Sequence, residues 1–187
     1  MRIIAGLFKG KKILEPADIK TRPLKDLTKE SIFNIIQHSN KFKVQLVNAN
    51  ILDIFSGVGS FGIECISRGA KKVTFIENYQ GVLPILKKNL SNLKINFNFE
   101  VIEKDVYEDK VLADLNDKFD VIFLDPPFKN STIDLILIKL QIFKILKKNG
   151  IIILHRHKSE NHNFPKNFKI IEEKKYGLSK IFFINLN

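Results

Sequence analysis

A glycine-rich run that begins at Asp53 has the composition of a ligand-binding turn. It reads DIFSGVGSFG, so Phe55 precedes two glycines, Gly57 and Gly59, that stand two positions apart. Glycine lets the backbone approach a ligand closely, and Glu77 ends the next predicted strand, where a carboxylate can accept hydrogen bonds from ribose hydroxyls. The run predicts a nucleoside-cofactor site that suits both NAD and S-adenosylmethionine, although the glycines could also serve only a tight strand-to-helix turn.

A second candidate site follows the apolar segment FDVIFL and consists of Asp125, Pro126, Pro127 and Phe128. An apolar strand that ends there delivers the carboxylate to the carboxyl edge of a parallel sheet, where ligands of open α/β folds bind. The two prolines prevent a helix from starting at once. The alternative is a turn that merely ends a strand.

The Asp-Pro-Pro-Phe run has a natural target in a planar base with an exocyclic amine. Asp125 and the Pro126 carbonyl can accept the two amine hydrogens while the base stacks on Phe128. Two such acceptors pull the nitrogen towards tetrahedral geometry and free its lone pair to attack a sulfonium methyl. This chemistry favours S-adenosylmethionine over NAD as the cofactor.

The chain of 187 residues has a strong basic excess, with 31 Lys or Arg, 20 Asp or Glu and a formal net charge of +11. A basic domain most often binds a polyanion such as nucleic acid, although nucleotide bias in the genome can give the same Lys-, Ile- and Asn-rich composition. The length fits one domain with an ample core, and 44% hydrophobic residues exclude global disorder.

Other classes of site are disfavoured by the residues available. The lone cysteine, Cys65, cannot form an internal disulfide or a Cys-based zinc site, and its apolar neighbours indicate a core thiol. His155, His157 and His162 have only Glu160 as a carboxylate at ligand spacing, which favours a solvated basic loop over a metal site. No apolar run is long enough to span a bilayer, and the start lacks the apolar stretch of a signal peptide. We expect a cytoplasmic monomer without a metal or a membrane partner.

Short apolar runs alternate with amphipathic segments over residues 49–187, which is the pattern of parallel strands joined by helices. The predicted strands cover residues 50–55, 72–76, 97–102, 119–124 and 150–154. The predicted helices cover residues 60–68, 79–93 and a segment bounded by Ser131 and Gly150. Residues 169–176 and 180–186 flank Gly177 as an antiparallel hairpin. The pattern predicts an α/β fold with a doubly wound, mostly parallel seven-stranded sheet and an antiparallel last strand.

Residues 1–48 differ in kind and predict a short basic extension. Two short strands around a glycine-bearing turn are expected over residues 2–14, then an extended piece through Arg22 and Pro23, then a helix over residues 26–38. So short a segment is marginal by itself, so it is expected to pack on the domain formed by residues 49–187.

Together these motifs resemble the class I S-adenosylmethionine-dependent methyltransferases, which have a Rossmann-like fold and modify amino groups of bases. The phrases RIIAG and GKK near the start, RP followed by KE and FN, and SRGA at residues 67–70 are similar to the 16S (small-subunit) rRNA guanine-N2 methyltransferases of the RsmD type. The resemblance covers nearly the whole chain. Because adenine-N6 and cytosine-N4 enzymes share the Asp-Pro-Pro-Phe run, the N-terminal phrases carry the guanine assignment.

The resemblance implies a role for each motif. Gly57, Gly59 and the neighbouring backbone would hold the methionine part of S-adenosylmethionine, and Asp53 and Phe55 of the same run would also bind the cofactor. Glu77 would hold the ribose, and Asp105 the adenine amine. Asp125, Pro126, Pro127 and Phe128 would face the target guanine. The residues expected against phosphates of 16S rRNA, free or in the small subunit, are Arg2, Lys9, Lys11, Lys12 and Arg22.

The chain departs from the family pattern at Leu24, at Leu27 and at His155 and Arg156, where an acidic residue is common after the fifth strand. Three rival functions stay open: a DNA or RNA adenine-N6 methyltransferase, a catalytically silent RNA-binding protein of the same fold, and an NAD-dependent dehydrogenase. The last of these leaves the Asp-Pro-Pro-Phe run without a purpose.

Overall fold

Parallel strands alternate with helices along most of the chain, as the sequence pattern predicts. The structure is a computed structural model that describes residues 1–16, 24–94, 97–127, 132–160 and 164–186. Its strands are β1 (Asn50–Ile54), β2 (Lys72–Ile76), β3 (Phe99–Ile102), β4 (Phe119–Leu124), β5 (Leu146–His157), β6 (Phe168–Tyr176) and β7 (Ser179–Leu186). Its helices are α1 (Asp26–His38), α2 (Ser60–Ser67), α3 (Leu83–Ser91), α4 (Asp109–Ala113) and α5 (Ile133–Ile142).

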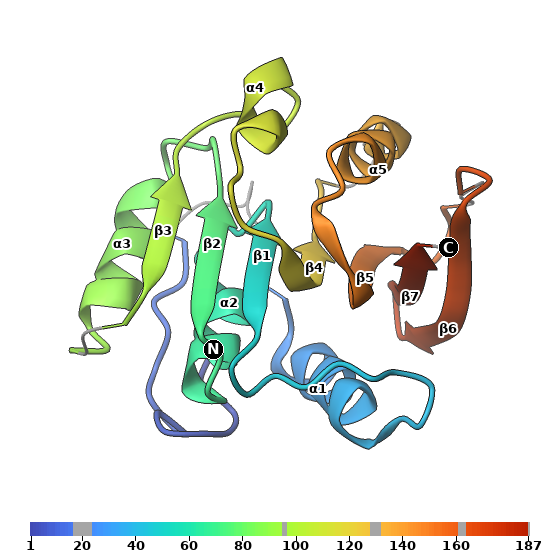
Figure 1. The fold of residues 1–187 in the computed structure, drawn as a ribbon. Coiled ribbons are helices and arrows are strands. Elements are labelled where there is room, and N and C mark those ends of the chain that lie inside the picture. The colour runs from blue at the N-terminus through green and yellow to red at the C-terminus, as the bar shows by residue number, and fades with distance from the viewer. Residues whose placement is uncertain (17–23, 95–96, 128–131, 161–163, 187) are drawn as a thin grey trace.

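The strands of this described part form one sheet in the order β3-β2-β1-β4-β5-β7-β6 (Figure 1). The pairs from β3 to β5 are parallel, whereas β7 is antiparallel to both β5 and β6. The predicted seven-stranded sheet with an antiparallel last strand is confirmed. Its strand order reverses between β1 and β4, and ligands of open α/β sheets bind outside the carboxyl ends of the strands at such a point.

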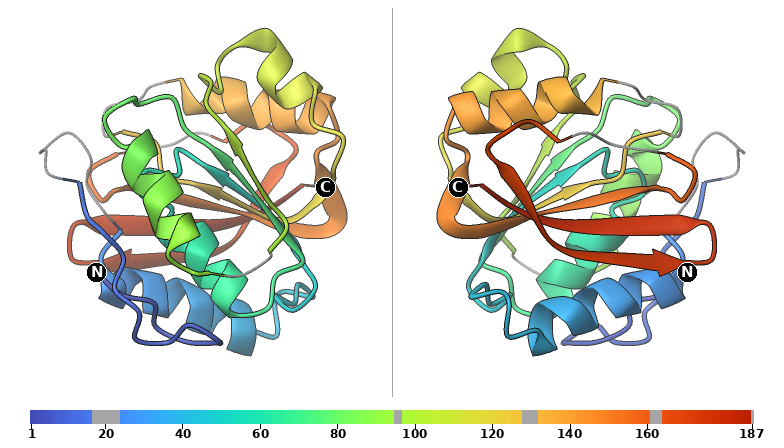
Figure 2. Two further views of the ribbon diagram at one scale, coloured as in Figure 1. Left: turned by 90° about the vertical axis from the view of Figure 1, so that its left-hand side faces the viewer. Right: turned by 90° about the vertical axis from the view of Figure 1, so that its right-hand side faces the viewer.

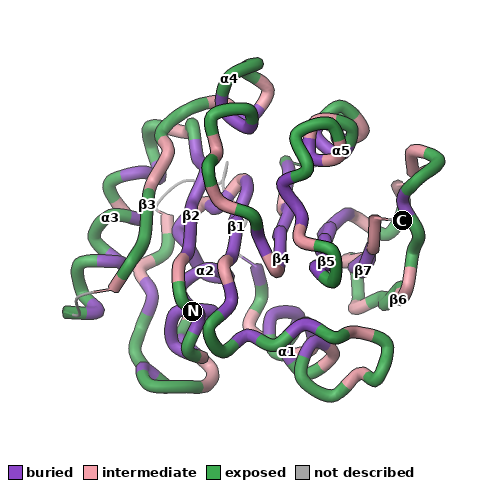
Figure 3. The backbone as a smooth tube through the Cα atoms, in the orientation of Figure 1, coloured by how far each residue is buried: buried purple, intermediate pink, exposed green. Residues whose placement is uncertain are grey.

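Alternating strand residues feed two separate cores. In β4, Val121 and Phe123 join the core beneath α1, α2 and α3, whereas Ile122 and Leu124 join the core beneath α4 and α5. Figure 2 shows these two groups of helices on opposite sides of the sheet. Figure 3 shows the buried central strands and the exposed edge strand β6. This two-residue alternation also decides which face the residues beyond each strand end will occupy.

The N-terminal segment packs on the core as expected, but it lacks the two predicted strands. The described residues 1–16 contain one isolated antiparallel bridge between Arg2 and Lys12, closed by turns. Ile3, Phe8 and Ile13 bury their side chains in the core of α1 to α3. The segment is therefore an ordered loop fastened to the domain instead of a β-hairpin.

The third predicted helix ends earlier than the sequence indicated. Lys144, with a φ of 51°, takes the left-handed conformation that terminates helices, and the Ile145 N–H donates to the Leu140 carbonyl at 3.1 Å. Lys147 and Lys148, which the predicted helical segment included, belong to β5, where Lys147 donates to Asp120 of β4 at 2.7 Å. Helix α3 begins at Leu83 instead of Tyr79, α4 was not predicted, and Ser131 lies outside the described residues.

Candidate active site at the carboxyl edge of the sheet

The glycine run forms the turn from β1 into α2. Phe55, Gly57 and Gly59 all have positive φ, at 60°, 55° and 81°. A Cβ on Gly59 would lie 2.5 Å from Leu86 Cδ1, so the turn lies against α3 with no room for a side chain there. The strained Phe55 backbone and the glycines together give a tight loop at the strand-order reversal.

Asp53 lies under this loop. Its carboxylate accepts the Gly62 N–H at 2.9 Å, and the residue is 1% exposed. Burial raises the pKa of Asp53 well above its usual value, the charges of Asp125 and Glu77 raise it further, and the Gly62 hydrogen bond lowers it in part. The sequence predicted that Asp53 binds the cofactor, whereas its observed contact braces the start of α2.

Glu77 follows β2 and accepts three backbone N–H groups. One carboxylate oxygen bonds to Gly57 at 2.7 Å, and the other bonds to Asn78 at 3.0 Å and to Tyr79 at 2.8 Å. The residue is buried, so these bonds join the glycine loop to the end of β2. These three hydrogen bonds therefore fix the Glu77 carboxylate beside the glycine turn.

Three of the predicted cofactor residues line one small pocket. Phe55, Glu77 and Asp105 border it, and the other lining residues are Ile76, Asn78, Lys104 and Val106. Asp105 Oδ1 accepts the Tyr107 N–H at 2.9 Å, and the Phe55 and Tyr107 rings lie 6.2 Å apart. An aromatic ring and two carboxylates that line one pocket suit a ligand with a flat base and a ribose.

Asp125 follows β4 next to the glycine turn. Its N–H donates to the Ile54 carbonyl at 3.3 Å, and its side chain is 21% exposed. Pro126 is buried and Pro127 exposed. The predicted Phe128 lies outside the described residues.

His155 is a site residue that the sequence analysis placed wrongly. It belongs to β5, is 8% exposed, and brings Nδ1 to 2.8 Å from Asp125 Oδ1 and Nε2 to 2.9 Å from Ser179 Oγ. The solvated-loop prediction is therefore wrong for His155. The alternation that buries Ile151 and Ile153 against α1 and α2 also puts His155 on that face, and this signal could have revealed it. His162 lies outside the described residues.

Burial by itself lowers the pKa of His155, but the Asp125 charge and the hydrogen bond to Asp125 together raise the pKa above its ordinary value. Smaller effects come from Arg156, which lowers the pKa, and Glu160, which raises it. Arg156 is almost fully buried and pairs with Glu160. His155 and Arg156, two of the four positions that depart from the family pattern, are thus built into β5.

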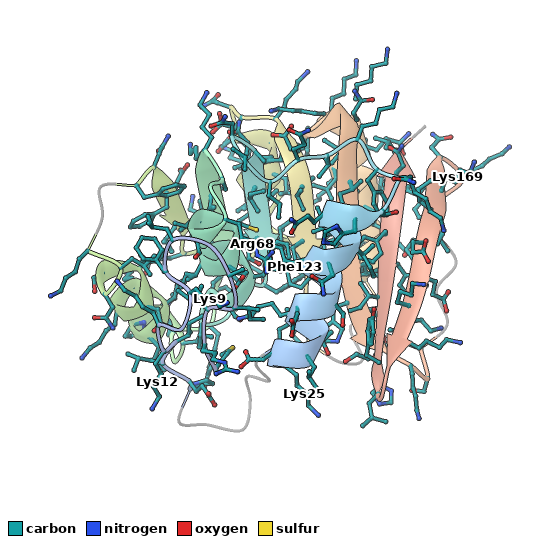
Figure 4. All side chains as sticks on the ribbon, turned by 90° about the horizontal axis from the view of Figure 1, so that it is seen from below. Lys9, Lys12, Lys25, Arg68, Phe123 and Lys169 are labelled. Atoms are coloured by element: carbon teal, nitrogen blue, oxygen red, sulfur yellow. The ribbon has the colours of Figure 1, made fainter. Side chains whose placement is uncertain are left out.

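Arg2, Lys9, Lys11 and Lys12 are all exposed on the N-terminal loop. Figure 4 shows Lys12 at the end of the sheet opposite Lys169. Because Lys169 begins β6, which runs in the direction of β5, Lys12 lies towards the edge where the parallel strands end. The same view shows Lys25, which the sequence analysis did not single out, at that edge. The predicted Arg22 lies outside the described residues.

A buried ion pair, also missed by the sequence analysis, fastens the loop to the domain. Lys29 of α1 and Glu64 of α2 are both fully buried, with their charged atoms 3.9 Å apart. Glu64 accepts the N–H groups of Ile4 at 2.8 Å and Ala5 at 3.0 Å, and Lys29 donates to the Arg2 carbonyl at 2.8 Å. Lys29 also donates to Ser60 Oγ at 3.2 Å, at the first residue after the glycine turn. The basic loop and the glycine turn therefore share one network.

Gly6 explains why the N-terminal phrase contains a glycine. Its φ is 80°, and a Cβ there would lie 1.8 Å from the Ser67 carbonyl oxygen. Ser67 Oγ donates to the Ala5 carbonyl at 2.5 Å and accepts the Phe8 N–H at 3.0 Å. The N-terminal segment at residues 2–6 thus packs directly against the segment at residues 67–70.

Within the described residues, no group of three or more His, Cys, Asp and Glu side chains is arranged to hold a metal ion. None of the described helices has the length and hydropathy to cross a membrane. Cys65 is fully buried, and burial raises the pKa of its thiol well above the usual value, as befits the predicted core thiol.

Known proteins are similar to this chain over most of its length. A family model described as Conserved hypothetical protein 95 matches residues 1–185. A Haemophilus influenzae protein named ribosomal RNA small subunit methyltransferase D is 35% identical, over 95% of this chain and 90% of its own length. The Escherichia coli protein of that name is 31% identical over 80% of this chain and 68% of its own. A solved "putative methylase" from Haemophilus influenzae aligns with a TM-score of 0.77 at 34% identity, covering all of this chain and 98% of its own.

Proposed function

The chain belongs to the family described as Conserved hypothetical protein 95, and from this premise we propose that it methylates the N2 amine of a guanine in small-subunit rRNA. It is an S-adenosylmethionine-dependent rRNA methyltransferase. The choice of guanine N2 is the proposal's finer part and rests on the N-terminal phrases. The observation that carries the activity is the position of Asp125 beside the glycine turn, at the reversal of strand order.

The charge of the site suits this chemistry. Asp125 and Glu77 both act electrostatically on Asp53, so three acidic side chains converge around one turn. S-adenosylmethionine, when bound, supplies a methyl group on a cationic sulfur. Glu77 and Asp105 border the pocket where its adenosine would lie, and an acidic surround favours the cation.

Asp125 would act on the nucleophile. Its carboxylate accepts an amine hydrogen, turns the nitrogen lone pair towards the methyl carbon, and stabilises the positive charge that develops on nitrogen as the new C–N bond forms. The electrons of the broken C–S bond stay on sulfur, and the methylated amine then loses a proton. The target base must leave its stack or already lie in an open loop to reach this edge.

The proposal is tested by mass spectrometry of nucleosides from small subunits, and from naked 16S rRNA, incubated with the enzyme and isotopically labelled cofactor. N2-methylguanosine is expected. Labelled N6-methyladenosine would support the adenine-N6 alternative, and no labelled nucleoside would support the silent RNA-binding protein. We further propose that the enzyme acts in the cytoplasm, where ribosomal subunits are assembled; its monomeric state stays a prediction.

Glu77→Ala is expected to weaken binding of S-adenosylmethionine before it affects the chemical step. Loss of a charged hydrogen bond to ribose costs about 1.5–3 kcal/mol, or about tenfold to a hundredfold in Kd. Isothermal titration calorimetry measures this directly. Glu100→Ala, on the exposed side of β3, is the matched control and is expected to bind normally. An unchanged Kd for Glu77→Ala would move the ribose contact to another residue.

Replacing Lys9, Lys11 and Lys12 with Gln is expected to flatten the salt dependence of rRNA binding. Each lost phosphate contact removes about 0.7–0.9 from the slope of log affinity against log salt. Lys11 also donates to the Leu93 carbonyl at 3.5 Å, so its contribution is expected to be the smallest. Affinity for S-adenosylmethionine is expected to stay unchanged, because the loop does not line the pocket.

The control for this triple variant neutralises the same number of charges at the opposite edge of the sheet. Lys118, Lys148 and Lys169 are exposed where parallel strands begin, and their replacement with Gln is expected to leave the slope unchanged. Equal slopes for both variants, measured with an rRNA fragment over a salt series, would show that the basic excess is compositional.

A further inference from the structure

His155 connects the end of β4 to β7 across β5. Its Nδ1 lies 2.8 Å from Asp125 Oδ1 and its Nε2 lies 2.9 Å from Ser179 Oγ. The histidine is 8% exposed, whereas the Asp125 side chain is 21% exposed, so the imidazole is the more enclosed partner. The His155 ring therefore holds the Asp125 carboxylate through Nδ1, and Ser179 holds the ring through Nε2.

Both protonation states of the ring preserve this arrangement. In the neutral ring with a proton on Nδ1, that nitrogen donates to Asp125 and Nε2 accepts the Ser179 hydroxyl. In the cation both nitrogens donate, and Ser179 Oγ accepts. What changes between the two states is the charge beside Asp125, which is zero in one and positive in the other.

That charge matters because the target nitrogen becomes positive during methyl transfer. A carboxylate beside a neutral imidazole presents its full negative charge to the amine, whereas a carboxylate beside an imidazolium is largely neutralised. On the basis of the function proposed above, we propose that His155 is a positioning residue that orients Asp125 and permits methyl transfer at full rate only while it is neutral. The imidazole does not touch the substrate in this account.

Other charged groups surround the ring. On its own strand and the turn beyond it lie Arg156 and Glu160, and β4 contributes Asp125, whereas the β7 side chain that bonds to the ring is the uncharged Ser179. Asp125 is the strongest of the interactions that raise the His155 pKa. Because the pKa is raised above the ordinary value of about 6.5, the ring changes charge at a higher pH than a free imidazole does. The rate is therefore expected to fall as pH drops through the His155 pKa.

The test compares pH–rate profiles of wild type and His155→Asn under single-turnover conditions with saturating cofactor. Asparagine keeps an N–H donor for Asp125 but has no proton to gain. Wild type is expected to lose about tenfold in rate per pH unit below the His155 pKa. His155→Asn is expected to lack this acid limb and to keep the high-pH rate within about threefold. His157→Asn, two residues along, is the matched control and is expected to retain the limb.

NMR titration of the His155 ring gives a readout that does not depend on activity. Asp125→Asn is expected to lower the His155 pKa. An acid limb that persists in His155→Asn overturns the inference, as does a His155 pKa that is unchanged in Asp125→Asn. Absence of guanine methylation by wild type at every pH would instead contradict the proposed function, and the NMR titration would still decide whether the pair exists.

Discussion

Asp125→Ala is expected to reduce methyl transfer by about a thousandfold or more while leaving the Kd for S-adenosylmethionine within about tenfold. The carboxylate follows β4 beside the glycine turn, and Asp125 does not line the pocket that Glu77 and Asp105 border. Its removal therefore takes away the acceptor for the amine and leaves the pocket intact. Single-turnover rates and calorimetric cofactor titrations measure the two effects separately.

Asp125→Asn refines this prediction because the amide keeps the size of the side chain. It loses the negative charge and is expected to be nearly as slow as the alanine variant. Asp114→Ala, an exposed carboxylate after α4, is the control and is expected to have wild-type kinetics. A parallel loss of cofactor affinity and rate in Asp125→Ala would assign the carboxylate to the cofactor instead of the base.

The sheet could be predicted from the sequence because buried parallel strands leave a strong local signal. All five predicted parallel strands exist, and Asp125 falls one residue beyond β4 as expected. The residues at which helices end were harder to predict from the sequence. Helix α5 ends because the Lys144 backbone takes the left-handed conformation, and no residue type in that segment predicts this conformation.

The site was predicted where local sequence determines it and missed where side chains from distant strands meet. Glu77 and Asp105 line the same pocket because each follows a strand of one parallel sheet. His155 meets Asp125 and Ser179 only because β5 lies between β4 and β7, and no local sequence pattern predicts that strand order. The same holds for Lys29 and Glu64, which are 35 positions apart and look like ordinary surface charges in the sequence.

The Lys29–Glu64 pair makes the second large prediction, because removing one partner of a buried ion pair costs about 3–5 kcal/mol. Glu64→Ala removes the buried charge that faces Lys29 and the carboxylate that accepts from the Ile4 and Ala5 N–H groups and from Arg68 Nε. Burial already lowers the pKa of Lys29, and the Glu64 charge acts against that effect. We expect the free energy of unfolding in urea to fall by that amount, which is a large share of the about 5–15 kcal/mol typical of domains.

A double-mutant cycle separates coupling from simple loss of packing. Lys29→Met combined with Glu64→Gln removes both charges with little change in volume, and is expected to be less destabilised than the sum of the two single variants by about 0.5–3 kcal/mol. Glu30→Ala, the exposed neighbour on α1, is the control and is expected to have little effect. Strict additivity would contradict the coupling. Lys29 also donates to Ser60 after the glycine turn. Glu64→Ala is therefore also expected to loosen the N-terminal loop and, with it, to weaken rRNA binding.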